Sequence, residues 1–274
     1  MKYGNAPNAR TPSASRRKLF CGEARRTLFL RSNWISVLFV LFSVCFFLVG
    51  AAYFMDCLYY AIVLSGIFET DSALLYPVFV FCAAFFLFLL LSPLLPGLKA
   101  YCCDLYRSRT EEALRVPPTE VFCCYASLEA VVRAWKLVFF RMTAIAALPL
   151  ALLISVWISE LLRAVCPPLL SVLCGIFAAV LLLIPACILC VLTTPLLYLS
   201  VTRPELTVSG CLRESARVMR YRIPEYLVFR LGFLPWLLLS VCSAGLLFFV
   251  YVLPYLIFAD ISFCFYSCSD IRSV

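Results

Sequence analysis

The chain has 274 residues, of which 64% are hydrophobic and only 14% are charged, and its net charge is +8. Soluble domains are nearer half apolar and about a quarter charged, so this composition excludes an ordinary soluble globular domain. The chain contains no histidine, which excludes Ser–His hydrolases and HExxH metalloproteases.

Long uncharged runs account for the high hydrophobic content. Each run is about long enough to cross a hydrocarbon core roughly 30 Å thick. A large soluble core would instead require amphipathic segments. The pattern predicts an all-α, polytopic transmembrane helical bundle. The runs cover residues 32–55, 72–98, 142–159, 164–202 and 231–259.

The first segment combines a basic N-terminus with two apolar stretches. Residues 1–17 are rich in Pro, Ser, Asn and Arg and are predicted to form a disordered basic cytoplasmic tail. The first apolar run follows a long basic region without a convincing cleavage site, so we interpret it as a retained signal anchor. The first two predicted spans are about 34–55 and 73–95.

The second segment begins with an amphipathic stretch. In 119–136 the apolar residues step by four and three, which predicts a helix with one apolar face, and Pro117-Pro118-Thr119 mark its start. Spans at about 137–158 and 170–199 follow, the second of them long and expected to be kinked at Pro185 and Pro195. The expected apolar face consists of Val121, Tyr125, Leu128, Val132 and Trp135.

The third segment contains an uncharged run of 29 residues, 231–259, which would be about 44 Å long as one helix. Two spans at about 226–243 and 246–263, with Gly245 at the turn, fit a bilayer better. The alternative is a single long helix kinked at Pro254, which would give five spans. The preceding stretch, 205–220, has an expected apolar face of Val208, Leu212, Ala216 and Met219.

A recurring pattern divides the chain into three units, 18–95, 117–200 and 205–266. Each unit has a basic amphipathic stretch, an aromatic residue where the chain meets the membrane and then apolar helices. The second and third units share Arg133/Arg217 and Phe140-Arg141/Phe229-Arg230. The prediction is therefore six spans in three interfacial-helix-plus-hairpin units, 18–266, followed by a short cytoplasmic tail, 267–274.

Basic residues alternate between loops in the manner of the positive-inside rule. Base-rich segments are 1–33, 99–136 and 203–222, whereas 56–72 has acids and no base, and Arg163 is the one base that falls clearly outside. The rule places the N-terminus in the cytoplasm, and six spans would place the C-terminus there too. We therefore expect a multi-pass protein of the cell membrane.

Candidate binding residues are the bases of the two amphipathic stretches. Arg213, Arg217 and Arg220, with Arg133 and Lys136, would meet anionic inner-leaflet lipids or a partner protein. The alternative is that these stretches pack against the protein's own spans. Two further bases, Arg141 and Arg230, are membrane-embedded, about one turn inside their spans, and are expected to snorkel to the headgroups.

The sixteen cysteines do not form a recognisable metal site. Cys187 and Cys190 lie inside an apolar span, and adjacent pairs such as Cys123-Cys124 do not fit a four-cysteine zinc site. We interpret cysteine here as a small, buriable residue. Whether Cys57 and Cys166, both expected on the outer side, form a disulfide stays open. No metal or cofactor is predicted.

The C-terminal third resembles a known family. It contains Ser215 and Met219 in a basic helix, then LVFRLGFLPW (227–236), then Ala244-Gly245-Leu246-Leu247, and it closes with Pro254-Tyr255 and Phe265-Tyr266. This order is similar to the bacterial integral membrane family catalogued as domain of unknown function 975, and RSNWISVLF (31–39) resembles that family's Gly-Asn-Trp start. Gly232 and Pro235 depart from the family's Ser and Gly. The resemblance implies a bacterial multi-span protein and supplies no catalytic residues.

Two functions fit this sequence. Spans without midplane carboxylates, together with cytoplasmic amphipathic faces, favour a non-catalytic accessory or scaffold subunit of a membrane complex. The repeats and proline-containing spans favour the alternative, a small-molecule or lipid permease. No hydrolase, phosphate-binding or intramembrane aspartyl motif is present, so an enzyme is not expected, and nothing points to a nucleic acid.

Overall fold

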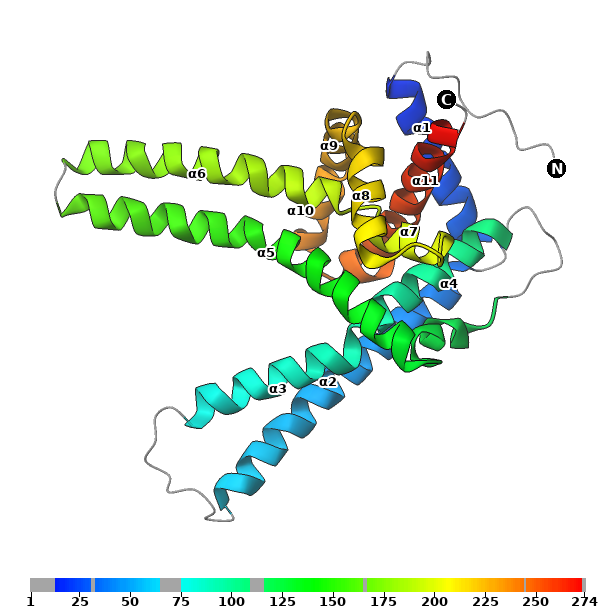
Figure 1. The fold of residues 1–274 in the computed structure, drawn as a ribbon, viewed down its shortest axis with the longest axis horizontal. Coiled ribbons are helices and arrows are strands. Elements are labelled where there is room, and N and C mark those ends of the chain that lie inside the picture. Colours follow the sequence, from blue (N-terminus) through cyan, green and yellow to red (C-terminus); the bar gives the residue numbers. More distant parts are fainter. Residues whose placement is uncertain are drawn as a thin grey trace.

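A computed structural model describes residues 13–30, 33–64, 75–108, 116–164, 167–243 and 245–272 (Figure 1). These residues form helices and turns, and no strand occurs among them. Six helices are long and apolar enough to cross a membrane: 33–64, 77–108, 128–163, 168–202, 223–242 and 248–268. The predicted all-α fold with six spans is confirmed, and the chain is a multi-pass membrane protein.

The first unit contains four helices, α1 (Ser13–Phe29), α2 (Asn33–Leu64), α3 (Leu75–Leu91) and α4 (Leu94–Ser108). Helix α1 begins inside the stretch 1–17 that we expected to be a disordered tail, and the rest of that stretch lies outside the described residues. Helices α3 and α4 continue one another across a break at Ser92-Pro93. Proline accounts for the break because it lacks the N–H that an α-helix needs.

The second unit contains η2 (Pro118–Tyr125), α5 (Leu128–Arg163), α6 (Pro168–Leu192) and α7 (Leu196–Thr202). The expected single helix over 119–136 is wrong: η2 is a short 3-10 helix, and Ser127 caps a new helix by accepting a hydrogen bond from the Ala130 N–H at 3.2 Å. The expected apolar face is therefore interrupted, and Leu128 is 77% exposed. Helix α6 runs through Pro185 and ends before Pro195.

The third unit contains α8 (Val208–Met219), α9 (Ile223–Leu231), α10 (Leu234–Cys242), the π-helix η3 (Phe248–Val252) and α11 (Leu253–Arg272). The chain reverses direction between α10 and η3, where Gly245 has φ +82°. A residue with a side chain rarely adopts this conformation, so glycine suits the turn. The predicted turn is confirmed, and the single long helix of the five-span alternative is not present.

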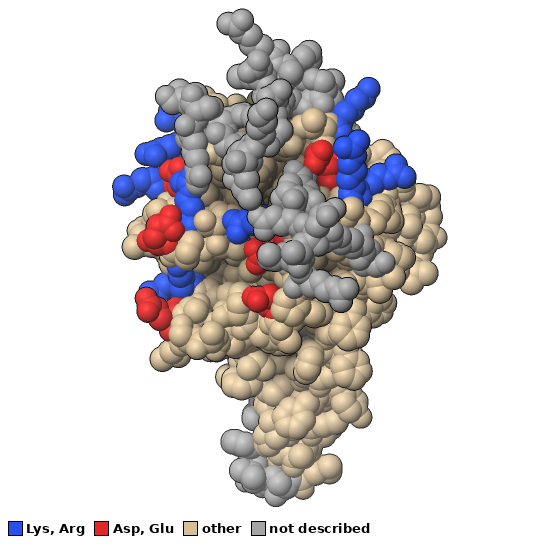
Figure 2. Space-filling view, turned by 90° about the vertical axis from the view of Figure 1, so that its right-hand side faces the viewer, with Lys and Arg blue, Asp and Glu red and all other residues tan. Residues whose placement is uncertain are grey.

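The membrane helices adjoin a common region, which we call the hub (Figure 1). The hub consists of α1, α4, η2, α7, α8 and the adjoining ends of α5 and α11. The α2–α3 and α5–α6 hairpins point away from it in different directions. In Figure 2 the charged side chains that are drawn gather on the upper part of the molecule, and the lower part of that face shows none.

The core lies where α1, α9 and α11 meet. Phe20, Phe229 and Phe263 are each at most 2% exposed, and the ring centroids of Phe20 and Phe263 are 5.5 Å apart at a steep angle. Such pairs contribute about 0.5–1.5 kcal/mol beyond the burial of their area. The outer hairpin ends are different, since Phe46 is 78% and Trp157 77% exposed, as expected of side chains that face lipid.

Candidate functional site

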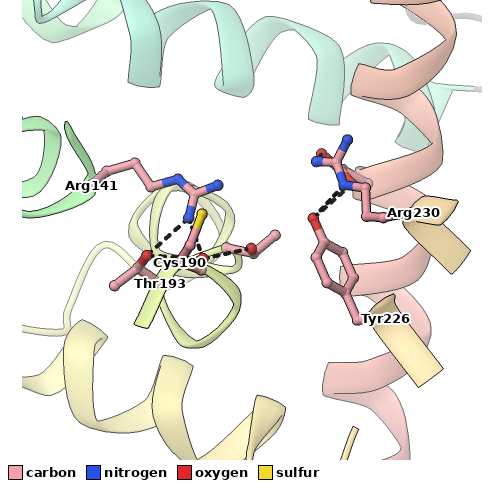
Figure 3. A network of polar contacts seen from close by, with 7 residues as sticks. Arg141, Cys190, Thr193, Tyr226 and Arg230 are labelled. Carbon is pink, nitrogen blue, oxygen red and sulfur yellow. Dashed lines mark hydrogen bonds and ion pairs between the residues drawn. The ribbon is translucent and has the colours of Figure 1, made fainter. Parts of the chain in front are cut away.

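A partly buried ion pair joins the two sides of the third hairpin (Figure 3). Arg230 Nη2 on α9 donates to Asp260 Oδ2 on α11 at 2.5 Å, and Arg230 Nε donates to the Tyr226 hydroxyl at 2.7 Å. Tyr226 in turn donates to Asp260 Oδ1 at 3.4 Å. The guanidinium also lies over the Tyr226 ring, 5.4 Å from its centroid. A charge in an apolar span needs such partners, because the uncompensated charge would be costly to bury.

A second arginine caps the end of α6. Arg141 Nη1 on α5 donates to the Cys190 carbonyl at 2.6 Å and to Thr193 Oγ1 at 2.9 Å (Figure 3). The last carbonyls of a helix lack helical donors and carry partial negative charge, so a cation here is stabilising. Arg141 therefore fixes the end of α6 that adjoins the hub to α5.

Both guanidinium groups bind a neighbouring helix, and that they also snorkel to the headgroups stays a prediction. The sequence analysis did not identify Asp260, Tyr226 or Thr193 as their partners. One signal for the ion pair was present: Arg230 lies 15 residues before Gly245 and Asp260 lies 15 residues after it. Equal spacing from a tight turn places two residues opposite each other in a helical hairpin.

The predicted surface arginines of α8 are exposed, whereas its other face is buried in the protein. Arg213, Arg217 and Arg220 are exposed, and Arg217 Nη1 lies 3.1 Å from Glu214 Oε2. The expected apolar face is confirmed in part, since Met219 is fully buried and Val208 and Leu212 are partly buried against the core. The buried residues are Cys211, Ser215, Val218 and Met219. Of the two alternatives for α8, packing against the protein itself is therefore the one observed.

The remaining predicted binding residues lie on the first turns of α5. Lys136 is exposed. Arg133 Nη1 donates to the Pro204 carbonyl at 2.5 Å, which ties α5 to the loop before α8. Its Nε and Nη2 are buried without a hydrogen-bond partner among the described residues. Arg133 thus contributes to the packing of the hub, and the five predicted bases do not form one cluster.

A cavity of about 460 Å³ opens in the hub between α4, η2, α5 and α7. Its polar lining includes Asp104, Glu120, Cys123, Cys124 and Arg133. The two thiol sulfurs are 4.0 Å apart, and the hydrogen bond from Cys124 lowers the pKa of Cys123 to about 7. The cavity therefore presents an exposed, partly ionised thiol at neutral pH.

The grouping of possible metal ligands can be followed for the described part of the chain. Within the described ranges, no three Cys, Asp or Glu side chains come together in a way that could hold a metal ion. Cys57 is exposed as a free thiol, and Cys166 lies outside the described residues, so a bond between them stays untested.

Comparisons of the chain with protein-family models, with curated proteins and with solved structures gave no match. The function is therefore argued from the geometry of the spans, the polar network and the hub.

Proposed function

We propose that this protein is a non-catalytic accessory or scaffold subunit of a membrane complex. The observation that carries the proposal is the divergence of its hairpins from the hub (Figure 1). Helices α5 and α6 pack extensively against each other. Residues on many sides of their outer halves stay exposed, as Leu153, Trp157 and Phe177 illustrate.

Divergent hairpins support a scaffold more than a transporter. A permeation route through a small bundle requires spans that converge around a polar path. The 460 Å³ cavity lies in the hub, and Pro185, inside the span α6, does not line it. Long helices that contact mainly their hairpin partner leave surface free for another membrane protein.

We further propose the orientation given by the basic residues. The hub would lie on the cytoplasmic side of the cell membrane, with both termini there. Arg213, Arg217 and Arg220 on α8 would then meet anionic headgroups, at roughly 1 kcal/mol per charge, or an acidic partner surface. Membership of the bacterial family that residues 205–266 resemble is part of the same proposal.

The alternative function is a small-molecule or lipid permease. Three membrane helices are interrupted near Pro93, Pro195 and Pro254, and interrupted helices occur in many transporters. Native mass spectrometry of the protein extracted into lipid nanodiscs distinguishes the two. A stoichiometric second protein would support the scaffold. A bound small molecule or a single lipid class without protein would overturn it in favour of the permease.

The role of α8 is tested by the triple variant R213Q/R217Q/R220Q. We expect the variant to lose partner protein or anionic lipid from the nanodisc-extracted particle, because the exposed charges are removed without touching the buried face. The matched control is K18Q/R25Q/R26Q, which removes three exposed bases from α1. Equal loss in both variants, or loss in neither, would count against a specific role for α8.

A further inference from the structure

The second membrane helix of every unit is interrupted at a proline. Ser92-Pro93 separates α3 from α4, Thr193-Thr194-Pro195 separates α6 from α7, and Pro254 lies at the start of α11, just after the π-helix η3. A proline cannot donate to the carbonyl four residues earlier, and the neighbouring helical bonds are displaced as well. Each break therefore frees carbonyls inside an apolar region, where they require other donors.

The second unit supplies the donors at the first break. Trp135 Nε1 on α5 donates to the Leu89 carbonyl, four residues before Pro93, at 2.6 Å. The Tyr125 hydroxyl on η2 donates to the next carbonyl, that of Leu90. The same η2 packs so closely on α4 that a Cβ at Gly97 would lie 1.9 Å from the Val121 carbonyl oxygen.

The third unit supplies a donor at the second break. The Leu196 N–H binds the Thr193 carbonyl, so the Leu192 carbonyl lacks its α-helical donor. Ser215 Oγ on α8, which is fully buried, donates to the Leu192 carbonyl at 2.5 Å. Helix α8 also packs against α7, just as η2 packs against α4.

The first unit supplies a donor at the third break. In an α-helix the N–H of residue 254 would bind the Val250 carbonyl, and Pro254 has none. Trp34 Nε1 on α2 donates to this carbonyl at 2.8 Å. Helix α1 packs along α11 through Phe20 and Phe263. The contacts between units therefore form a closed cycle. Side chains of unit 2 bind the break in unit 1, a side chain of unit 3 binds the break in unit 2, and a side chain of unit 1 binds the break in unit 3.

We propose that the chain is a single-chain pseudo-trimer of three similar units. The three proline breaks are its hinges, and a hydrogen-bonding side chain of another unit fixes each hinge, which makes that side chain a latch. The outer parts of the α2–α3 and α5–α6 hairpins diverge and lack each other's support (Figure 1). The helix break in each of these hairpins consequently determines the direction in which the hairpin leaves the hub. This arrangement is a conformational device that serves either proposed function.

Hydrogen exchange of the full-length protein in nanodiscs tests the first latch. W135F removes the indole donor and keeps an aromatic ring, so the amides of residues 88–98 should exchange roughly 2- to 10-fold faster, the range expected for loss of one hydrogen bond. W157F is the matched control, because Trp157 is 77% exposed at the outer end of the same helix. Unchanged exchange in W135F, or equal acceleration in W157F, would overturn the proposal.

The variant P93A tests whether the hydrogen bond of Trp135 matters because Pro93 lacks an N–H. An alanine restores the N–H that the Leu89 carbonyl lacks, so W135F should no longer accelerate exchange when P93A is present. The pair W34F and P254A should behave in the same way for residues 246–258. If W135F and W34F accelerate exchange equally with and without the prolines, the indoles only fill space and the hinge-and-latch proposal is wrong.

Discussion

Arg230 shows how one charged residue can make the stability of an apolar hairpin depend on a single partner, Asp260. Its side chain is 34% exposed and that of Asp260 is 15% exposed. Removing one member of a fully buried pair costs roughly 3–5 kcal/mol, because a charge is left without compensation. Neither side chain of this pair is fully buried, so a smaller cost is expected.

We therefore expect Asp260→Asn to lower the free energy of unfolding by about 2 kcal/mol. The double variant Arg230→Met/Asp260→Leu should recover much of this loss, because it buries no unpaired charge. Denaturant titration in detergent micelles, followed by tryptophan fluorescence, measures both. The control is Glu160→Gln, whose exposed pair with Arg163 should contribute less than about 1 kcal/mol. Equal effects of the two single variants would contradict a special role for Asp260.

The thiol of Cys123 provides a pH-dependent prediction. Because the Cys124 thiol stabilises the Cys123 thiolate, the pKa of Cys123 is about 7 instead of 9. Alkylation requires the thiolate, so its rate should be low below pH 6, rise through about pH 7 and level off above pH 8. Peptide mapping after iodoacetamide pulses at several pH values measures the rate at this residue.

Cys124→Ala is the matched variant for that measurement. It removes the hydrogen-bond donor and leaves Cys123 in place, so the midpoint should move upward toward pH 9. A midpoint that stays near 7 in Cys124→Ala would show that the neighbouring thiol is not the cause.

At the scale of elements, the packing of η2 on α4 depends on one glycine. A Cβ at Gly97 would meet the backbone of Val121, which cannot move aside as a flexible side chain could. Gly97→Ala should therefore separate η2 from α4 and lower the free energy of unfolding by about 1–3 kcal/mol, the usual cost of overpacking.

Gly22→Ala on α1 is the control for Gly97→Ala. A Cβ at Gly22 has open space around it, and alanine favours a helix over glycine by about 1 kcal/mol. The same unfolding titration should thus show one glycine variant destabilised and the other unchanged or stabilised. A stable Gly97→Ala protein would mean that η2 does not pack on α4 as described.

The elements also show what the sequence could predict. Uncharged run length and the Ser-Ala-Gly turn identified six spans, because both depend on local hydrophobicity and on a conformation that glycine favours. The face of η2 was mispredicted and the face of α8 was predicted only in part, since a helix break after Tyr125 and the buried Ser215 both follow from contacts with other units. Periodicity alone does not reveal a polar residue that is buried to satisfy a distant carbonyl.

The candidate site was predictable only in part for the same reason. Arg141 and Arg230 stood out because charges are rare in apolar spans. Their partners required the helical register, and the hub cavity is completed by α7, which is far in sequence from the other three elements that line it. The three-unit division was visible as a recurring pattern, whereas the order in which the units hold one another depended on tertiary contacts such as that of Trp34 with Val250.

At the scale of the whole molecule, the packing of α1 on α11 is the contact that bears most directly on membrane topology. Six spans return the chain to the side of the membrane on which it began, and α1 packs along α11, the helix that contains most of the last span. The basic residues of 1–33 and 203–222 support our proposal that this side is cytoplasmic.

A reporter enzyme that is active only outside the cytoplasm tests this topology when it is fused after Val274. We expect it to be inactive there and active when it is inserted between residues 65 and 74, which connect α2 to α3. A cytoplasm-active reporter at the same two positions is the control and should give the opposite pattern. Activity of the first reporter after Val274 would mean that α11 ends on the opposite side of the membrane from α1. That result would contradict the packing of α1 on α11 and the closed cycle of contacts between the three units.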